Sequence, residues 1–184
     1  GCNLRCSYCD TRYAYEEGEP MSVEDILLAM PPNYTGLVEV TGGEPLLQDE
    51  CPTLVGRLVR EGHTVLVETN GSLDIRSLPK GAVCILDMKC PDSGMSDQMN
   101  LDNLRHLRSR DEVKFVVQSR ADYIWAKNLL RQSPPRSPEK VLFSPAHGTC
   151  EPRELAEWLL ADRLEARIQL PLHRLLWPGV ERAK

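Results

Sequence analysis

The sequence predicts an α/β fold built on a largely parallel sheet, and three observations support this prediction. Apolar segments of strand character alternate with amphipathic helical segments, which is the pattern of right-handed β-α-β crossovers. Polar side chains follow four of the expected strands, where ligands collect in parallel sheets and barrels. The chain of 184 residues is 41% hydrophobic and 27% charged, as expected for one globular domain, over residues 1–184, with a real core.

The helices are expected from their caps and their apolar spacing. Ser22 is a good N-cap residue, and Asp25 is a weaker capping-box partner three positions later. Apolar residues then recur at helical spacing until two consecutive prolines end the segment. The next helix is expected near Pro52, whose missing N–H costs nothing in a first turn, and Gly62 ends it. Later helical segments are expected over residues 101–107, 121–132 and 152–161.

Strands are expected over residues 37–41, 63–68, 83–88, 113–117, 140–143 and 166–170. The polar residues at their carboxyl ends are Thr41 to Glu44, Glu68 to Asn70, Asp87 with Lys89, and Ser144 to His147. One polar strand end has an ordinary structural explanation, but four in register predict a binding site at one edge of the sheet.

The first eleven residues carry the most specific chemical pattern. Cys2, Cys6 and Cys9 have C-x3-C-x2-C spacing, so one loop can wrap three thiolates around a metal centre. Cubane iron–sulfur clusters normally take four cysteine ligands, and three would leave one iron open, as in a catalytic metal site. Zinc is an alternative, although zinc sites usually show paired C-x2-C groups or histidines at fixed offsets. Three unrelated buried thiols are a further alternative.

Charge and cysteine usage exclude several classes of protein. A net charge of −5 argues against nucleic-acid binding, and no segment has the length of a membrane span or a secretory signal. Seven cysteines, an odd number, favour the reducing cytoplasm over a disulfide framework. Cys51, Cys84, Cys90 and Cys150 are expected to be buried or incidental thiols, with a second cluster as the alternative. Because Cys2 follows the first residue directly and no initial Met is present, the chain is expected to be trimmed at its amino terminus.

The cysteine loop resembles the cluster-binding loop of the radical S-adenosylmethionine superfamily, and Cys9-Asp10-Thr11 resembles more particularly the 7-carboxy-7-deazaguanine synthase family. Gly42 to Pro45 resembles the superfamily's Gly-Gly-Glu-Pro motif, and Gln169 to Trp177 resembles the family's Gln-x-x-x-His-x-x-x-Trp ending. The resemblance implies an open, partial parallel β/α barrel of the radical S-adenosylmethionine type, with its first strand trimmed. A strand and a Gly-rich substrate-contacting segment precede the cysteine loop in that family.

The implied activity is that of a radical S-adenosylmethionine carbon–nitrogen lyase. It contracts the ring of 6-carboxy-5,6,7,8-tetrahydropterin to 7-carboxy-7-deazaguanine, with loss of ammonia, on the route to queuosine and related deazapurines. The implied cofactors are a [4Fe–4S] cluster, S-adenosylmethionine and Mg²⁺. The implied partners are the small pterin substrate, an electron donor such as flavodoxin and a second copy in a homodimer, with no nucleic acid and no membrane.

The resemblance also implies roles for individual residues, and no catalytic residue beyond the cluster ligands. It assigns the cluster to Cys2, Cys6 and Cys9, and Mg²⁺ to the hydroxyl of Thr11, an oxygen donor of the kind this ion prefers. The implied contacts with S-adenosylmethionine are Tyr8, Cys9, Asp10, Gly42, Gly43, Glu44, Glu68, Asn70, Lys89, Ser144, Ala146 and His147. The implied substrate contacts are Thr41, His173 and Pro178.

These residues also have ordinary structural interpretations. The double glycine lets backbone approach a ligand and Glu44 can accept from an ammonium group, but the same tetrapeptide can be a plain strand-to-helix turn. Thr11 can simply cap a turn, and the tail can be a core-packing helix. Ser144 stands where the family usually has Gln, and six residues follow Pro178.

Two other functions are compatible with parts of the sequence. An activase of the same superfamily, which takes a hydrogen from a glycine of a partner enzyme, has the same cysteine spacing. The Cys-Asp-Thr sequence and the His–Trp tail favour a small substrate over that activity. A non-catalytic zinc-binding domain is the alternative from another class.

Overall fold

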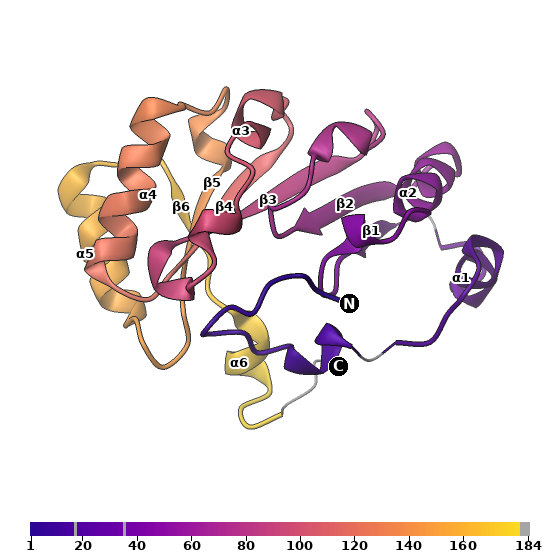
Figure 1. Ribbon diagram of the computed structural model, residues 1–184, viewed down its shortest axis with the longest axis horizontal. Coiled ribbons are helices and arrows are strands. Elements are labelled where there is room, and N and C mark those ends of the chain that lie inside the picture. Colours follow the sequence, from indigo (N-terminus) through magenta and orange to yellow (C-terminus); the bar gives the residue numbers. More distant parts are fainter. Residues whose placement is uncertain (17, 35, 181–184) are drawn as a thin grey trace.

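The protein forms one parallel sheet of six strands that follow each other in chain order (Figure 1). The computed structural model describes residues 1–16, 18–34 and 36–180. The strands are β1 Leu37–Val40, β2 Thr64–Thr69, β3 Val83–Lys89, β4 Glu112–Val117, β5 Val141–Pro145 and β6 Arg167–Ile168. Right-handed crossovers between consecutive neighbours place the connecting helices on one face of such a sheet. The sheet is open, so the predicted partial parallel barrel is confirmed.

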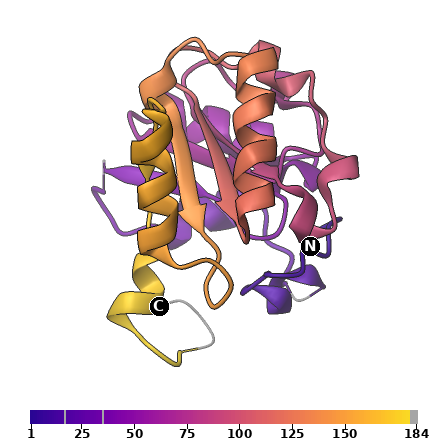
Figure 2. The ribbon, with the colours of Figure 1, turned by 90° about the vertical axis from the view of Figure 1, so that its left-hand side faces the viewer.

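The helices cover one side of the sheet, and α4 and α5 lie next to each other on it in both ribbon views (Figures 1 and 2). The α-helices are α1 Val23–Ala29, α2 Cys51–Arg60, α3 Asn103–His106, α4 Arg120–Gln132, α5 Pro152–Asp162 and α6 Leu172–Leu176. Short 3₁₀ turns are η1 Arg12–Tyr15, η2 Pro45–Leu47, η3 Ile75–Ser77, η4 Pro91–Ser93, η5 Ser96–Gln98 and η6 Pro138–Lys140. The amino-terminal loop and α6 lie together on the lower side of Figure 1.

Local chemistry explains where two helices begin and end. The Ser22 hydroxyl accepts from the Asp25 N–H (3.1 Å), and the Asp25 carboxylate accepts from the Ser22 N–H (3.3 Å). The predicted capping box is therefore confirmed. Pro52 lies in the first turn of α2, and Gly62 follows the helix with a φ of +91°, a conformation that glycine adopts without steric cost.

Two segments differ from the prediction. The turn η1 lies in a segment for which no regular structure was expected, because its polar and aromatic residues show no apolar period. Strand β6 has two residues instead of five. The chain leaves the sheet after Gln169, whose N–H still bonds to the Phe143 carbonyl (2.8 Å), and turns into α6.

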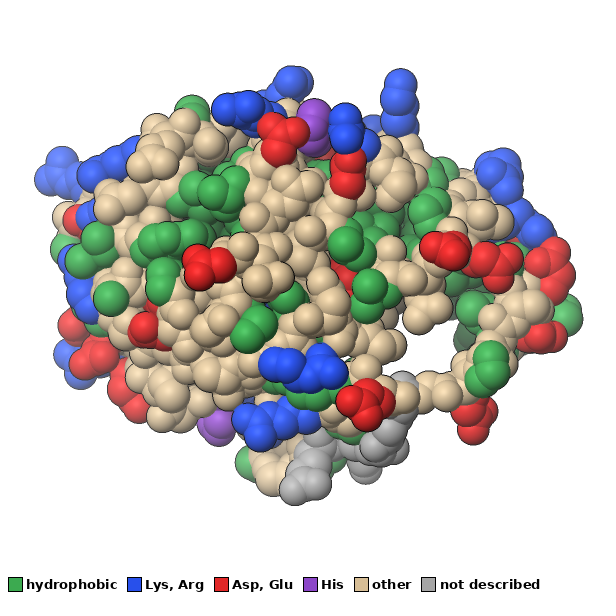
Figure 3. Space-filling model, viewed as in Figure 1, with side chains coloured by type: hydrophobic (Ala, Val, Ile, Leu, Met, Phe, Trp, Pro, Cys, Tyr) green, Lys and Arg blue, Asp and Glu red, His purple; other side chains and the backbone are tan. Residues whose placement is uncertain are grey.

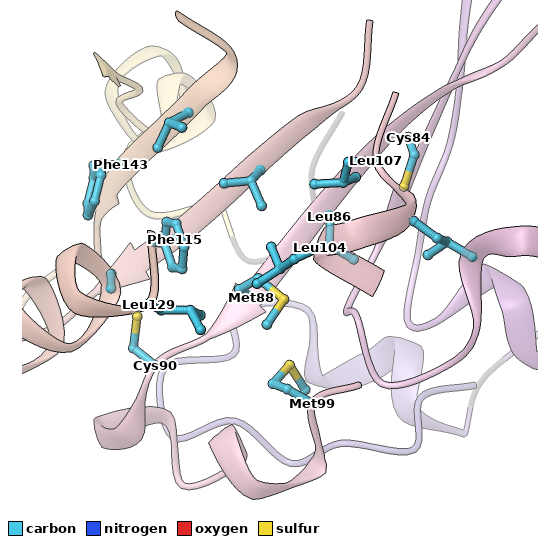
Figure 4. Packing of buried hydrophobic residues seen from close by; sticks show 14 of the residues in the cluster. Cys84, Leu86, Met88, Cys90, Met99, Leu104, Leu107, Phe115, Leu129 and Phe143 are labelled. Atoms are coloured by element: carbon cyan, nitrogen blue, oxygen red, sulfur yellow. The ribbon is translucent and has the colours of Figure 1, made fainter. Parts of the chain in front are cut away.

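The core lies between β3 to β5 and the helices, where Met88, Phe115 and Phe143 are fully buried (Figure 4). Cys84 and Cys90 belong to the same cluster of apolar side chains. Cys51 and Cys150 are also buried. The prediction that these four cysteines are buried thiols is therefore confirmed.

The surface carries charged side chains of both signs, and the face in Figure 3 shows no concentrated basic patch. Within the described ranges, no helix is long and apolar enough to cross a membrane.

Candidate functional site

A cavity of about 470 Å³ lies at the carboxyl ends of the strands, between the sheet and the cysteine loop. Residues from the amino-terminal loop, from the ends of β1 to β5 and from the segment of α6 line it. The predicted site residues that line it are Cys2, Cys6, Tyr8, Cys9, Asp10, Thr11, Thr41, Gly42, Gly43, Glu68, Asn70, Lys89, Ser144, Ala146, His147 and His173. The parallel sheet therefore brings together segments that are far apart in the sequence.

The cysteine loop packs directly against the double glycine. The Glu44 N–H donates to the Gly1 carbonyl (2.9 Å), and the Cys2 N–H donates to the Tyr15 carbonyl (3.3 Å). A Cβ atom on Gly43 would lie 2.3 Å from the Gly1 oxygen and 2.8 Å from Cys2 Cβ. Only glycine permits this approach, so the two motifs fit together as one unit.

Glu44 faces away from the cavity. Its side chain is 1% exposed and accepts from Thr69 Oγ1 (2.8 Å), the Asn70 N–H (2.6 Å) and the Leu46 N–H (2.9 Å). Burial raises the pKa of this carboxyl, while the three hydrogen bonds oppose the increase. Three protein donors leave acceptor capacity on this carboxylate, so the expected contact with a cofactor ammonium group stays a prediction. Within the protein, Glu44 joins the end of β1 to the end of β2.

The three cysteines suit an iron–sulfur cluster by their chemistry, because three free thiols line one cavity. All three line the same cavity, and their surroundings offer weak donors, with Asn70 Nδ2 3.8 Å from Cys2 Sγ and Thr11 Oγ1 3.6 Å from Cys9 Sγ. Among the described residues, no three His, Cys, Asp or Glu side chains are close enough to hold one metal ion. Thiolates around one tetrahedral zinc lie roughly 3.8 Å apart. A four-iron cubane is larger than one ion, and its ligands lie farther apart.

Burial favours the thiol form of Cys6. It raises the pKa of Cys6, and the ammonium of Lys89 opposes that increase. A metal centre that binds Cys6 must therefore displace its proton.

Charged pairs form the floor of the cavity. Lys89 Nζ lies 2.8 Å from Asp87 Oδ2, and Lys114 Nζ lies 2.7 Å from Glu68 Oε1. Burial by itself lowers the pKa of Lys89, but Asp87 and Tyr8 outweigh it, and the pKa lies well above its ordinary value. Both lysines therefore stay charged. Asp87 Oδ1 is buried and, among the described residues, has no hydrogen-bond partner, so it is available to a donor on a ligand.

Sequence reasoning missed Lys114 as a cavity residue, whereas Asp87 and Thr69 lie at the strand ends where a site was expected. Lys114 could have been found from its position inside strand β4, because a charged residue there alternates with apolar neighbours. In the structure, every second residue of β4 is partly exposed while the residues between them are buried. Lys114 is paired in register with Asp87 on β3. A charged residue inside a strand of a parallel sheet indicates that this face of the sheet is not covered by a helix.

The tail reaches the cysteine loop through one carboxylate. His173 Nε2 lies 3.0 Å from Asp10 Oδ2, and a guanidinium nitrogen of Arg174 lies 3.5 Å from the same oxygen. Helix α6 therefore closes one side of the cavity. Pro178 is exposed and lies outside the residues that line the cavity, and its expected substrate contact stays a prediction. The leucines of α6 are largely exposed, so α6 is not the core-packing helix of the alternative interpretation.

Comparisons with known proteins identify the family. The model of the radical SAM superfamily matches residues 1–84. The 7-carboxy-7-deazaguanine synthase of Koribacter versatilis is 39% identical over 96% of this chain and 84% of its own length. The synthase of Chlorobaculum tepidum is 39% identical, over 96% of this chain and 82% of its own length. The chain belongs to the 7-carboxy-7-deazaguanine synthase family.

Solved structures show the same fold. Escherichia coli QueE matches with a TM-score of 0.73 at 22% identity, over 92% of this chain and 81% of that one. Streptococcus suis SuiB bound to S-adenosylmethionine matches with a TM-score of 0.65 at 14% identity, over 98% of this chain and 51% of that one.

Membership in the 7-carboxy-7-deazaguanine synthase family confirms the resemblance of the cysteine loop and makes the chain a radical S-adenosylmethionine enzyme. The superfamily implies a [4Fe–4S] cluster and S-adenosylmethionine as cofactors. Family membership therefore removes the support for the zinc-domain alternative.

Proposed function

We propose that this protein converts 6-carboxy-5,6,7,8-tetrahydropterin to 7-carboxy-7-deazaguanine, with loss of ammonia, as a carbon–nitrogen lyase. The observation that carries the proposal is the cavity in which three thiols, the double glycine and the strand-end charges meet. The same chain is 39% identical to a 7-carboxy-7-deazaguanine synthase over 84% of that protein's length. The activase alternative has no comparable support among the relatives described above.

Cys2, Cys6 and Cys9 would hold the cluster through their thiolates. When bound, the reduced cluster and S-adenosylmethionine supply the radical that takes a hydrogen atom from the substrate. Gly42 and Gly43 present backbone rather than side chains to the cavity, which lets a ligand approach closely.

The remaining cofactor contacts surround the cavity. The residues proposed to orient S-adenosylmethionine are Tyr8, Cys9, Asp10, Glu68, Asn70, Lys89, Ser144, Ala146 and His147. Lys89 stays charged beside Asp87, which suits it to a carboxylate group. The strand ends on one side and the cysteine loop on the other exclude water from the reacting atoms.

Thr11 is the proposed Mg²⁺ ligand, and Thr41 and His173 are the proposed substrate contacts. All three line the cavity. The Thr11 hydroxyl is a neutral oxygen donor, so substrate oxygens and water would complete the shell of this hard ion. His173 is held by Asp10, which places the imidazole at the side of the cavity closed by α6.

An anaerobic assay tests the proposed function. The full chain is reconstituted with iron and sulfide and incubated with the pterin, S-adenosylmethionine, a reductant and Mg²⁺. We expect more than one equivalent of deazapurine per S-adenosylmethionine, and a lower rate when EDTA removes Mg²⁺. Formation of 5′-deoxyadenosine without deazapurine would contradict the proposed substrate.

The substitution Glu44→Gln is expected to lower the free energy of unfolding by about 2 kcal/mol, because the amide N–H₂ would face a buried backbone donor. Urea unfolding of the cluster-free chain measures this change. Glu157→Gln is the control, because Glu157 is exposed and its carboxylate pairs with Arg153 on the surface of α5, and a change below about 0.5 kcal/mol is expected. Equal changes in the two variants would contradict the structural role of Glu44.

We further propose that residues 1–184 act as a single domain, supported by one continuous sheet and one core. The proposed electron donor is a small redox protein such as flavodoxin, and the proposed assembly is a homodimer. Seven free cysteines support a location in the reducing cytoplasm.

A further inference from the structure

Asp122 is a fully buried carboxylate in the first turn of α4, and its hydrogen bonds run toward the cysteine loop. It is 0% exposed. One oxygen accepts from the Asp92 N–H (2.9 Å) and the other from the Gln118 N–H (3.0 Å). Asp92 lies in the turn η4 that follows β3, and Gln118 follows β4. Asp122 therefore ties together the segments that leave two neighbouring strands.

The turn η4 has its own internal bonds. Ser93 is 1% exposed, and its hydroxyl donates to the Cys90 carbonyl (2.6 Å) and accepts from the Met95 N–H (3.0 Å). Ser119, the N-cap of α4, donates to Asp92 Oδ2 (2.5 Å). The turn is thus fixed both to β3 and to α4.

Ser7 attaches the cysteine loop to this unit. Its N–H donates to the Ser93 carbonyl (3.0 Å), and its hydroxyl donates to the Asp92 carbonyl (2.8 Å). The same hydroxyl accepts from Gln118 Nε2 (2.9 Å). Ser7 lies directly after Cys6 and two residues before Cys9, and the three bonds end on the two segments that Asp122 joins.

The two ends of the loop are therefore held in different ways. Near Cys2 the loop is held by the double-glycine turn and by Tyr15, and near Cys6 it is held through Ser7. A loop that supplies three ligands to one cluster needs both anchors, because the ligand sulfurs must stay at the spacing of the cluster faces. Residues that orient metal ligands typically change metal affinity by about 10- to 100-fold when replaced.

We infer that Asp122 and Ser7 are positioning residues for the metal centre: Asp122 fixes the η4 turn, and Ser7 transmits that position to Cys6 and Cys9. The inference rests on the cluster assignment in the proposed function. Asp122 acts through Asp92 and Gln118, and Ser7 acts through the backbone of the loop between Cys6 and Cys9.

Two substitutions test the inference. Asp122→Asn keeps the size of the side chain but turns an N–H₂ group toward a backbone N–H. Ser7→Ala removes only a hydroxyl on an exposed residue, so this variant retains the fold. The matched control is Asp162→Asn, because Asp162 also ties α4 to its surroundings, accepting from Tyr123 Oη (2.8 Å) and Lys127 Nζ (2.6 Å), without touching the cysteine loop.

The full chains are reconstituted anaerobically, and loss of iron to a ferrous chelator is timed. We expect loss about tenfold faster than wild type for Asp122→Asn. For Ser7→Ala we expect iron loss about threefold faster than wild type, because this variant loses the contribution of about one neutral hydrogen bond. Asp162→Asn should remain within about twofold of wild type. The electron paramagnetic resonance spectrum of the reduced cluster should also change in the first two variants and not in the control.

The inference is overturned if Asp122→Asn and Ser7→Ala both lose iron at the same rate as the control and both give its spectrum. If Asp122→Asn fails to fold by circular dichroism, Ser7→Ala decides alone. A wild-type chain that holds the cluster but makes no deazapurine contradicts the proposed substrate and leaves the positioning role standing. A wild-type chain that binds no cluster overturns both.

Discussion

Replacing Cys6 with alanine is expected to abolish turnover, with a loss of more than about 100-fold in product formation. Cys6 is the middle one of the three proposed ligands and the most buried of them. Its removal leaves two thiolates, which cannot hold a cubane in the cavity. Iron and sulfide content after anaerobic reconstitution measures the cluster, and 5′-deoxyadenosine formation measures cofactor cleavage without reference to the pterin.

Cys150→Ala is the control for Cys6→Ala. Cys150 is also a buried free thiol, but it lies outside the main cavity and is not part of the cysteine loop. The loss of its sulfur is expected to cost about 1 kcal/mol of stability and no iron. If Cys6→Ala held as much iron as Cys150→Ala, the assignment of the cluster to this loop would be wrong.

The substitution Gly43→Ala is expected to have the second largest effect, a loss of about 100-fold in turnover. The added Cβ would lie 2.3 Å from the Gly1 oxygen, 2.7 Å from the Gly1 carbonyl carbon and 2.8 Å from Cys2 Cβ. Two of these atoms belong to the backbone and cannot rotate away, so the start of the cysteine loop must move. Overpacking of this kind costs typically about 1–3 kcal/mol, and here it would also displace Cys2, a proposed cluster ligand.

Isothermal titration with S-adenosylmethionine and the rate of 5′-deoxyadenosine formation measure the effect of Gly43→Ala. Gly18→Ala is the matched control, because among the described residues beyond its chain neighbours no heavy atom lies within 4 Å of its added Cβ, and its φ is not positive. That variant is expected to stay within about 0.5 kcal/mol of wild type in stability. Wild-type affinity and turnover in Gly43→Ala would show that the contact between the two motifs is not required.

The sequence by itself determined most of the helices and strands, and most of the residues that line the site. The capping box at Ser22 and the stop at Gly62 depend on groups that are neighbours in the chain, so they could be predicted locally. Strand ends could be located in the same way, and parallel pairing brings consecutive strand ends to one edge. For this reason Thr41, Asn70 and His147 were correctly placed together around one cavity.

Only the tertiary structure decided the direction of individual side chains and the contacts between distant segments. Glu44 turns toward β2 because two donors there satisfy it, and a motif of four residues does not specify those donors. Lys114 reaches Glu68 across the intervening strand, and Ser7 binds Gln118, 111 positions further along the chain. These contacts depend on strand register and on the packing of turns, which are set by the whole core. A spacing pattern identifies which residues can do chemistry, whereas their partners are fixed by long-range geometry.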